Sequence, residues 1–204
     1  PVSKADDDTA KDNGDWPRWR GVHNNGISTA TGLLDSWPEE GPPIAWSVRG
    51  LGDGFSSVAI ANGRIYTMGR KGGSTSLVCR KLEDGSELWA TEVGGGDHPN
   101  CTPTVDLEAN LVFGLNHGGN LLCANATKGE AVWKKSYKND FGGRMMSGWG
   151  YSESPLVDGD LLICTPGGDK GVMVALNKKT GELVWATQAE GLGGAGYASP
   201  IISN

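Results

Sequence analysis

One hairpin pattern occurs three times in this 204-residue sequence. Each copy has a small residue, a glycine six positions later and a tryptophan four positions after the glycine; the copies span residues 79–89, 123–133 and 175–185. The apolar run before each turn and the short run after it suit strands, and the glycine allows positive φ at the end of the turn. The sequence therefore predicts three β-hairpins of one kind, each ending on a tryptophan.

The spacing of these hairpins constrains the fold. Their glycines, Gly85, Gly129 and Gly181, lie 44 and 52 residues apart. Repeats of this length are typical of arrays of supersecondary units, and a propeller blade of four strands takes about 40–50 residues. No long segment shows helical periodicity. We therefore predict an all-β chain built from four-stranded antiparallel propeller blades.

The chain divides into three parts. Residues 1–15 are polar and include three successive aspartates, which is typical of a disordered tail. Residues 16–44 contain paired tryptophans and several prolines, and we expect this segment to pack on the propeller. Residues 45–204 make up the blades: three complete ones and a fourth that begins near 197–202.

Apolar runs and turn residues place the strands of each blade. We predict strands near 55–60, 64–68, 76–81 and 87–91, then 102–105, 111–115, 121–125 and 131–135, then 154–157, 161–164, 172–176 and 182–187. A lone outer strand is predicted near 44–48. Three blades with two unpaired strands cannot close a ring and hide their edges. The simplest interpretation is an open, partial propeller, the N-terminal half of a longer protein.

Charge and hydropathy exclude two classes of protein. The net charge of −6 argues against a nucleic-acid partner, which would require a basic stripe. No run approaches the ~18 consecutive apolar residues of a transmembrane helix. The chain begins with proline rather than methionine, so we expect that an upstream segment precedes it.

The four cysteines fit a packing role. Cys79 and Cys123 occupy the repeat position held by Ala175, and Cys164 lies in an apolar run; Cys101 is near a loop. No Cys-x-x-Cys pair is present. Because a free cysteine behaves as a small apolar residue, we favour packing for all four. A disulfide or a metal ligand is the alternative.

The longer second step of the repeat identifies a candidate functional face. Its eight extra residues fall within 134–153, between the last strand of one blade and the first strand of the next. Binding residues gather on loops that a rigid scaffold holds in place. We predict that this loop face, at the mouth of the axial channel, contains Asp97, His98, Arg144, Trp149, Tyr151, Glu153 and Tyr197.

The pattern small-x-Asn/Asp-x-x-Thr-Gly-x-x-x-Trp resembles the repeat of pyrroloquinoline-quinone (PQQ) enzymes. It is complete at 175–185, whereas Lys128 replaces threonine in the second copy and Lys81 and Asp84 depart from it in the first. The Ser/Thr-Pro pairs at 102–103, 154–155 and 199–200 resemble the starts of the family's innermost strands. The resemblance covers roughly residues 46–204. It implies a ring of about eight blades, with Trp89, Trp133 and Trp185 buried between neighbours.

The resemblance implies two functions. Some members of the family are non-catalytic propellers, such as a lipoprotein that helps to assemble outer-membrane barrels, and others are PQQ-dependent alcohol dehydrogenases. The dehydrogenases carry a vicinal Cys-Cys pair, which this chain lacks. We favour a non-catalytic extracytoplasmic module, periplasmic or secreted, that binds a protein or small molecule at the loop face. The alternative is a PQQ-dependent alcohol dehydrogenase whose cofactor ligands lie partly in a missing C-terminal half.

For that alternative, the candidate cofactor-binding residues are those of the loops at the channel mouth: Trp149, Glu153, Arg144, Tyr151, Asp97 and His98. Trp149 offers a stacking surface for a planar quinone, and Glu153 with Asp97 or Asp169 offers the oxygen ligands that calcium prefers. No spacing ties these groups together. PQQ and calcium are therefore candidates only, and the sequence assigns no catalytic residue and no metal site. A polar, solvated loop face is the competing interpretation.

Overall fold

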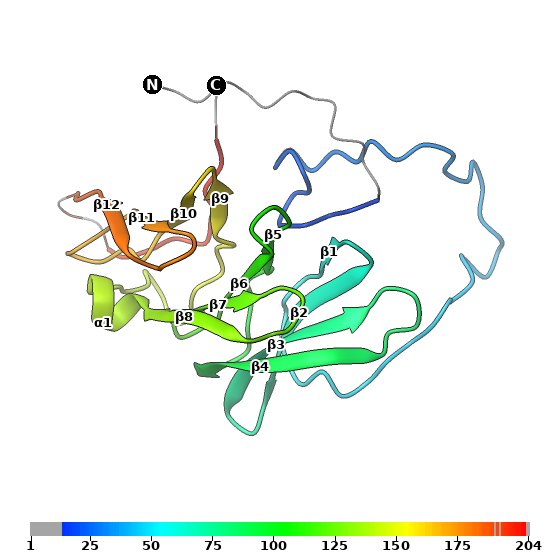
Figure 1. Cartoon of the computed structure of the whole chain (residues 1–204), viewed down its shortest axis with the longest axis horizontal. Coiled ribbons are helices and arrows are strands. Elements are labelled where there is room, and N and C mark those ends of the chain that lie inside the picture. The colour runs from blue at the N-terminus through cyan, green and yellow to red at the C-terminus, as the bar shows by residue number, and fades with distance from the viewer. Residues whose placement is uncertain (1–13, 190, 192, 203–204) are drawn as a thin grey trace.

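The computed structural model describes residues 14–189, 191 and 193–202 (Figure 1). Most of the predicted tail, residues 1–13, lies outside the described residues. The described residues form three four-stranded antiparallel sheets, each with its strands paired in sequence order. Their strands are β1 (Ala59–Ala61), β2 (Arg64–Lys71), β3 (Ser74–Lys81) and β4 (Glu87–Gly95); β5 (Thr104–Asp106), β6 (Leu111–Leu115), β7 (Asn120–Asn125) and β8 (Ala131–Ser136); β9 (Leu156–Asp158), β10 (Leu161–Cys164), β11 (Val174–Asn177) and β12 (Leu183–Ala186).

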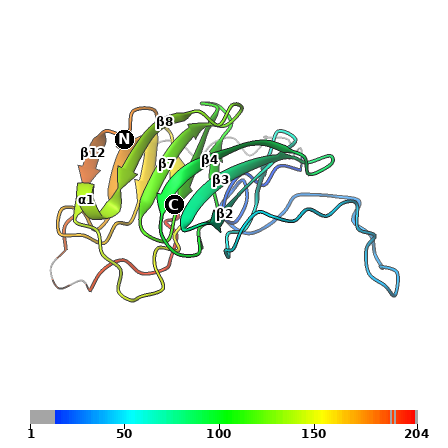
Figure 2. The same ribbon diagram turned by 90° about the horizontal axis from the view of Figure 1, so that it is seen from below.

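The three sheets stand side by side as an open array (Figure 2). Strands β1, β5 and β9 are the innermost of their blades, and β5 contacts both of the others. The predicted open, partial propeller of three complete blades is therefore confirmed. The sequence did not anticipate the short helix α1 (Tyr137–Phe141), which lies in the 134–153 insertion. Ser136 caps it by accepting a hydrogen bond from the Asn139 N–H, and Gly142 ends it with φ of 65°.

One apolar cluster runs through all three blades. Leu77, Phe113 and Leu162, one from each sheet, are fully buried in it. Strand β6 is buried along its whole length, because the middle blade is flanked by a blade on both sides. All four cysteines are buried free thiols, as the packing prediction requires.

The repeated hairpins have the same register in each blade. The small residue of the pattern lies opposite the tryptophan, as in the Cys123–Trp133 and Ala175–Trp185 pairs, and a bulge follows at once. Gly129 and Gly181 end the turns with φ of 77° and 72°. An L-residue rarely adopts this conformation, so the turn selects glycine.

The same glycines seat the tryptophan of the preceding blade. A Cβ at position 129 would lie 2.5 Å from the Trp89 ring, and a Cβ at 181 would lie 2.8 Å from the Trp133 ring. Each indole also donates its N–H to the carbonyl three residues before the glycine: Trp89 to Ala126 at 3.2 Å and Trp133 to Lys178 at 3.0 Å. Both tryptophans are partly buried, so each links two blades.

Trp46 makes the same contact with the first blade. Its ring would lie 2.8 Å from a Cβ at Gly85, and its N–H donates to the Leu82 carbonyl at 3.0 Å. The strand predicted near 44–48 is wrong, however, because residues 44–48 have no regular structure. No neighbouring strand among the described residues offers this segment a hydrogen-bonding edge. Trp46 therefore docks on the next blade as the tryptophan of an outer strand does, although residues 44–48 do not pair with a neighbouring strand.

The other end of the array corrects a second expectation. Trp185 was predicted to be buried between blades, but 37% of it is exposed. No blade among the described residues lies beyond β12, so no glycine-bearing turn covers the indole. Residues 197–202 form no strand, yet Ser199 Oγ accepts a hydrogen bond from the Ser154 N–H at 2.9 Å. Ser154 Oγ in turn accepts one from the Thr102 N–H at 3.0 Å.

Candidate functional site

The insertion that the sequence singled out forms a loop at residues 143–151. Hydrogen bonds hold the backbone of Arg144 on both sides. The Arg144 N–H donates to the Pro166 carbonyl of the third blade at 3.1 Å, and the Arg144 carbonyl accepts from the N–H of Ala195, which follows that blade, at 2.8 Å. The Tyr151 N–H donates to the His117 carbonyl in the middle blade at 3.0 Å. The loop is thus anchored to two blades, and its backbone holds its side chains in fixed positions.

Trp149 is the most exposed large side chain of this loop, with 77% of its surface in solvent. Its backbone is nevertheless anchored, since Asn100 Nδ2 donates to its carbonyl at 3.0 Å and its own N–H donates to Ser147 Oγ at 3.3 Å. Ser147 also hydrogen-bonds to the Tyr197 hydroxyl. Trp149 and Tyr197 are among the residues predicted for this face, whereas Asn100 is not; its place two residues after His98 was the available signal.

The charged candidates of the loop face form two separate pairs. Arg144 Nη1 lies 2.7 Å from Asp169 Oδ1, and both side chains are exposed. His98 Nε2 lies 3.2 Å from Asp97 Oδ1, and the imidazole ring packs against Phe55. Exposed pairs of this kind contribute little stability. Each of the two carboxylates thus already has a nitrogen partner within its own pair.

Glu153 is not on the solvated face at all. Only 1% of it is exposed, and its carboxylate accepts hydrogen bonds from the Tyr137 hydroxyl at 2.7 Å and from the Thr165 N–H at 2.8 and 2.9 Å. The Thr165 hydroxyl donates to it as well. Burial raises the pKa of Glu153, and the hydrogen bonds from Thr165 and Tyr137 oppose that rise. The carboxylate therefore crosslinks the 137–141 helix to the third blade.

Tyr151 is buried beside this carboxylate. Its ring meets the Tyr137 ring edge-on at 5.0 Å between centroids, and its hydroxyl donates to the Pro166 carbonyl at 2.9 Å. Burial raises the pKa of Tyr151 to about 12. The sequence offered no sign that Tyr151 and Glu153 point inward while Trp149, two residues before Tyr151, points out.

The predicted site residues do not converge on a cation site. Both oxygens of Glu153 accept hydrogen bonds, and Asp97 and Asp169 are engaged with His98 and Arg144. Among residues 14–202, wherever the structure describes them, no group of three His, Cys, Asp or Glu side chains is placed to hold a metal. The described oxygen ligands therefore do not fit the calcium that the resemblance implied.

The start of the N-terminal segment contacts all three innermost strands. Trp16 forms a two-hydrogen-bond bridge with Ile60 in β1, at 2.7 and 2.9 Å. Next, the Pro17 carbonyl accepts from the Val105 N–H of β5 at 2.8 Å, and Arg18 Nη1 then donates to the Val157 carbonyl of β9 at 3.5 Å. Ile60, Val105 and Val157 are the middle residues of the three innermost strands. Three successive residues thus cross three blades.

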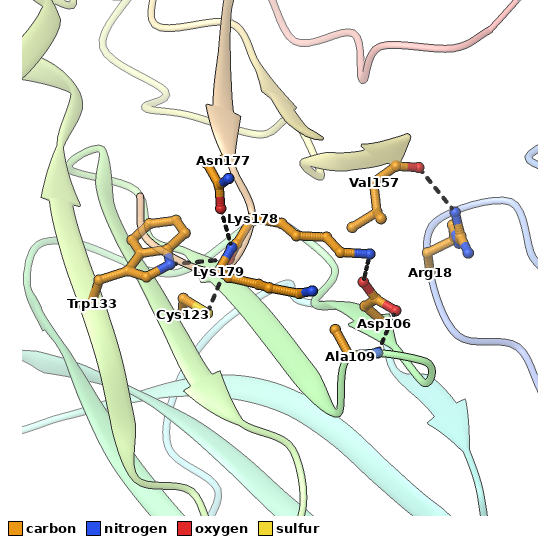
Figure 3. A network of polar contacts seen from close by, with 9 residues as sticks. All are labelled: Arg18, Asp106, Ala109, Cys123, Trp133, Val157, Asn177, Lys178 and Lys179. Atoms are coloured by element: carbon orange, nitrogen blue, oxygen red, sulfur yellow. Dashed lines mark hydrogen bonds and ion pairs between the residues drawn. The ribbon is translucent and has the colours of Figure 1, made fainter. Parts of the chain in front are cut away.

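A buried ion pair lies next to this crossing (Figure 3). Lys178, in the hairpin turn of the third blade, places Nζ 2.6 Å from Asp106 Oδ2 at the end of β5, and both side chains are only 6% exposed. The Ala109 N–H donates to the other carboxylate oxygen at 3.1 Å. Because the Lys178 carbonyl also accepts from the Trp133 indole, one residue joins the second and third blades twice.

The comparisons with known proteins agree with this geometry. The family model described as "Outer membrane protein assembly factor BamB" matches residues 33–135 and again residues 83–204. The two matches overlap and together extend over most of the chain. The chain belongs to this PQQ-like propeller family. No curated protein matches the chain.

Solved propellers of this PQQ-like kind share the fold at low identity. BamB from Moraxella catarrhalis superposes with a TM-score of 0.52 and 20% identity, over 71% of this chain and 39% of its own length. The quinohemoprotein alcohol dehydrogenase ADHIIG from Pseudomonas putida HK5 gives 0.61 and 17%, over 84% of this chain and 26% of its own. The corresponding enzyme from Comamonas testosteroni gives 0.60 and 18%, with the same coverage.

Two further findings concern the length of the chain and its helices. The chain spans less than half the length of these propellers, so it corresponds to part of such a ring. Within the described residues, no helix is both long enough and apolar enough to cross a bilayer.

Proposed function

We propose that this chain is part of a non-catalytic, extracytoplasmic PQQ-like propeller, periplasmic or secreted, that binds a protein partner through the 143–151 loop. One observation supports this most: Trp149 is 77% exposed although its backbone is anchored to Asn100 and Ser147. Tryptophan is enriched among the residues that dominate protein interfaces. The description of the matching family as an outer-membrane assembly factor supports both a protein partner and this location.

Site-specific photo-crosslinking tests the interface. A photoreactive residue in place of Trp149 should give a discrete crosslinked protein in the source cells. The matched control places the same residue at Trp37, which is 62% exposed on the N-terminal segment. Equal crosslinking at both positions, or none at Trp149, contradicts the proposal.

A second candidate function is PQQ-dependent alcohol oxidation. The two quinohemoprotein alcohol dehydrogenases favour it, since their TM-scores are higher than that of BamB, but identity below 20% speaks for the fold alone. On this alternative the calcium ligands come from outside the described residues, because the Glu153 carboxylate already accepts hydrogen bonds from Tyr137 and Thr165. The assay adds PQQ, calcium, an alcohol and a dye acceptor. Alcohol-dependent dye reduction would overturn the non-catalytic assignment.

A further inference from the structure

The side of the third blade that points away from the middle blade repeats the geometry of an occupied interface. In the middle blade, directly opposed residues form a row across the sheet: Thr104, Phe113, Cys123 and Trp133. Opposed residues share one side of a sheet, and this row faces the third blade, since the Trp133 indole donates to the Lys178 carbonyl at 3.0 Å. The equivalent row of the third blade is Leu156, Ile163, Ala175 and Trp185. This row, the free face, therefore lies toward the position of a following blade.

Asp158 lies on the free face at the position that Asp106 holds in the middle blade. Each aspartate ends the innermost strand of its blade, opposite the leucine that begins the next strand, and Asp158 shares a side of the sheet with Leu156, two residues before it. The Asp106 carboxylate lies 2.6 Å from Lys178 Nζ of the third blade (Figure 3). Asp158 is partly buried, and in the part of the chain that the structure describes no cation or hydrogen-bond donor reaches its carboxylate.

The Trp185 indole lacks a partner in the same way. It is partly exposed, and no carbonyl of the described residues accepts its N–H. The tryptophans of the two earlier repeats each donate to the carbonyl three residues before a turn glycine. In the second interface that carbonyl belongs to Lys178, the residue whose side chain also pairs with Asp106. One residue of the turn therefore serves both the indole and the aspartate.

The two occupied interfaces are each matched at this position. In the first interface the corresponding residues are Ala61 and Ala126, both buried, and in the second they are Asp106 and Lys178. An alanine thus accompanies an alanine, and an aspartate accompanies a lysine. A carboxylate enclosed between blades needs a cation, because an unpaired buried charge is strongly destabilising. By the same rule, a blade that covers Asp158 should supply a positive charge.

We propose that the free face docks a further propeller blade whose hairpin turn carries lysine or arginine three residues before its glycine. The side chain of this residue pairs with Asp158, and its carbonyl accepts the Trp185 N–H. A further blade is the occupant that continues the series of interfaces, and charge complementarity at Asp158 selects which blade fits. A second copy of this chain does not fit, because its glycine turns are already covered by Trp46, Trp89 and Trp133.

The experiment adds a blade to the full chain. A copy of residues 158–187 is placed after Ile202, so that Ser199 and Pro200 take the place of the Ser-Pro pair at 154–155 and the copied turn carries Lys178. Fluorotryptophan labelling and fluorine NMR report on Trp185, whose signal is assigned with Trp185→Phe. We expect Trp185 to lose its solvent isotope shift on extension, because the copied turn covers it, while the signal of the exposed Trp149 stays unchanged.

Four versions of the extended chain test the charge pairing. They combine Asp158 or Asp158→Ala in the original third blade with Lys178 or Lys178→Ala in the copied blade, and urea unfolding measures their stability. With Asp158 present, we expect the copied Lys178→Ala to lower the folding equilibrium constant about tenfold or more, because a buried pair loses one partner. In the Asp158→Ala chain we expect a loss of less than about threefold. Equal losses in both backgrounds overturn the proposal.

A peptide tests the same contact without relying on the added blade to fold. The hairpin of residues 172–187, closed by a disulfide between its ends, is titrated onto the 204-residue chain, and the Trp185 signal reports binding. The matched control is the same peptide with Lys178→Ala, which we expect to bind about tenfold more weakly. Equal affinity for the two peptides, or no shift with either, overturns the proposal. Sedimentation that shows a dimer burying Trp185 would make a second copy the occupant and overturns it as well.

Discussion

Trp133 and Trp185 occupy the same position in successive repeats, but their surroundings differ. Trp133 packs over Gly181 of the next blade and donates its N–H to the Lys178 carbonyl at 3.0 Å. Trp185 lies opposite Ala175 in the same register, yet it is 37% exposed, beside the exposed Leu183 and Val184. The hairpin thus positions each indole, and the following blade decides whether that indole is buried.

This difference shows how the array is stabilised. Each blade interface combines a tryptophan, a glycine-bearing turn and an indole hydrogen bond, so stability grows with each neighbouring pair of blades. The second interface has the buried Lys178–Asp106 pair in addition. At the corresponding positions of the first interface lie the buried alanines Ala61 and Ala126. Variants at the two ends of the third blade can therefore separate the contribution of the hairpin from that of its neighbour.

The largest effect is expected for Lys178→Met, which leaves Asp106 buried without its closest cation. Breaking a buried pair by removing one partner costs about 3–5 kcal/mol, and we expect about 3 because Arg18 remains near Asp106. Urea unfolding of the variant and the wild type measures this loss in the free energy of unfolding. Lys179→Met, at the exposed neighbouring position, is the control and should change the free energy of unfolding by about 0.5 kcal/mol or less. Equal effects would show that the ion pair does not join the blades.

Trp133→Ala should be nearly as damaging. Truncating a buried aromatic side chain costs about 3–5 kcal/mol, and a partly buried indole belongs at the lower end, about 3. Trp185→Ala should cost less than about 1 kcal/mol, because no described blade covers that indole. Chemical denaturation of the two variants gives the comparison directly. Similar losses would mean that Trp185 is covered, by self-association or otherwise, and sedimentation would detect such association.

Gly129→Ala isolates the role of the turn. A positive φ costs an L-residue about 1–2 kcal/mol, and the new Cβ would also lie 2.5 Å from the Trp89 ring, so we expect about 2–3 in total. Gly63→Ala is the matched control, since its φ of 69° is similar and nothing lies within 4 Å of its Cβ; it should cost about 1 kcal/mol. Thermal melts of both variants measure how much more Gly129→Ala destabilises the chain than Gly63→Ala does. Equal losses would show that the Trp89 indole moves away from the new Cβ at no cost.

The smallest effect is a pH dependence that arises from Glu153. Burial raises the pKa of this carboxyl above its usual 4.5, so the folded chain binds more protons than the unfolded chain just above that pH. Stability from this group is therefore present at low pH and is lost as pH rises through the raised pKa. Urea titrations from pH 4.5 upward should show the advantage of the wild type over Glu153→Gln shrinking with pH. An advantage that grows with pH would contradict the raised pKa.

The sequence identified the contacts that repeat. Equal spacing placed a tryptophan and a glycine-bearing turn in each hairpin, and Trp89 and Trp133 lie where this spacing predicted. It did not reveal the orientation of Tyr151 and Glu153, because the insertion occurs once and has no second copy for comparison. Whether a side chain in such a loop points inward depends on residues far along the chain, here Tyr137 and Thr165.

By itself, the sequence determined the strands, the glycine turns and the tryptophan of each blade, because these depend on local conformation and on packing between adjacent repeats. Only the tertiary structure decided that residues 16–18 cross the three innermost strands and that Lys178 reaches Asp106. These contacts join residues that lie 44 to 139 positions apart in the sequence, where no spacing rule applies. Their formation depends on the blades first assembling, since only then do the innermost strands lie close enough for one short segment to touch all three.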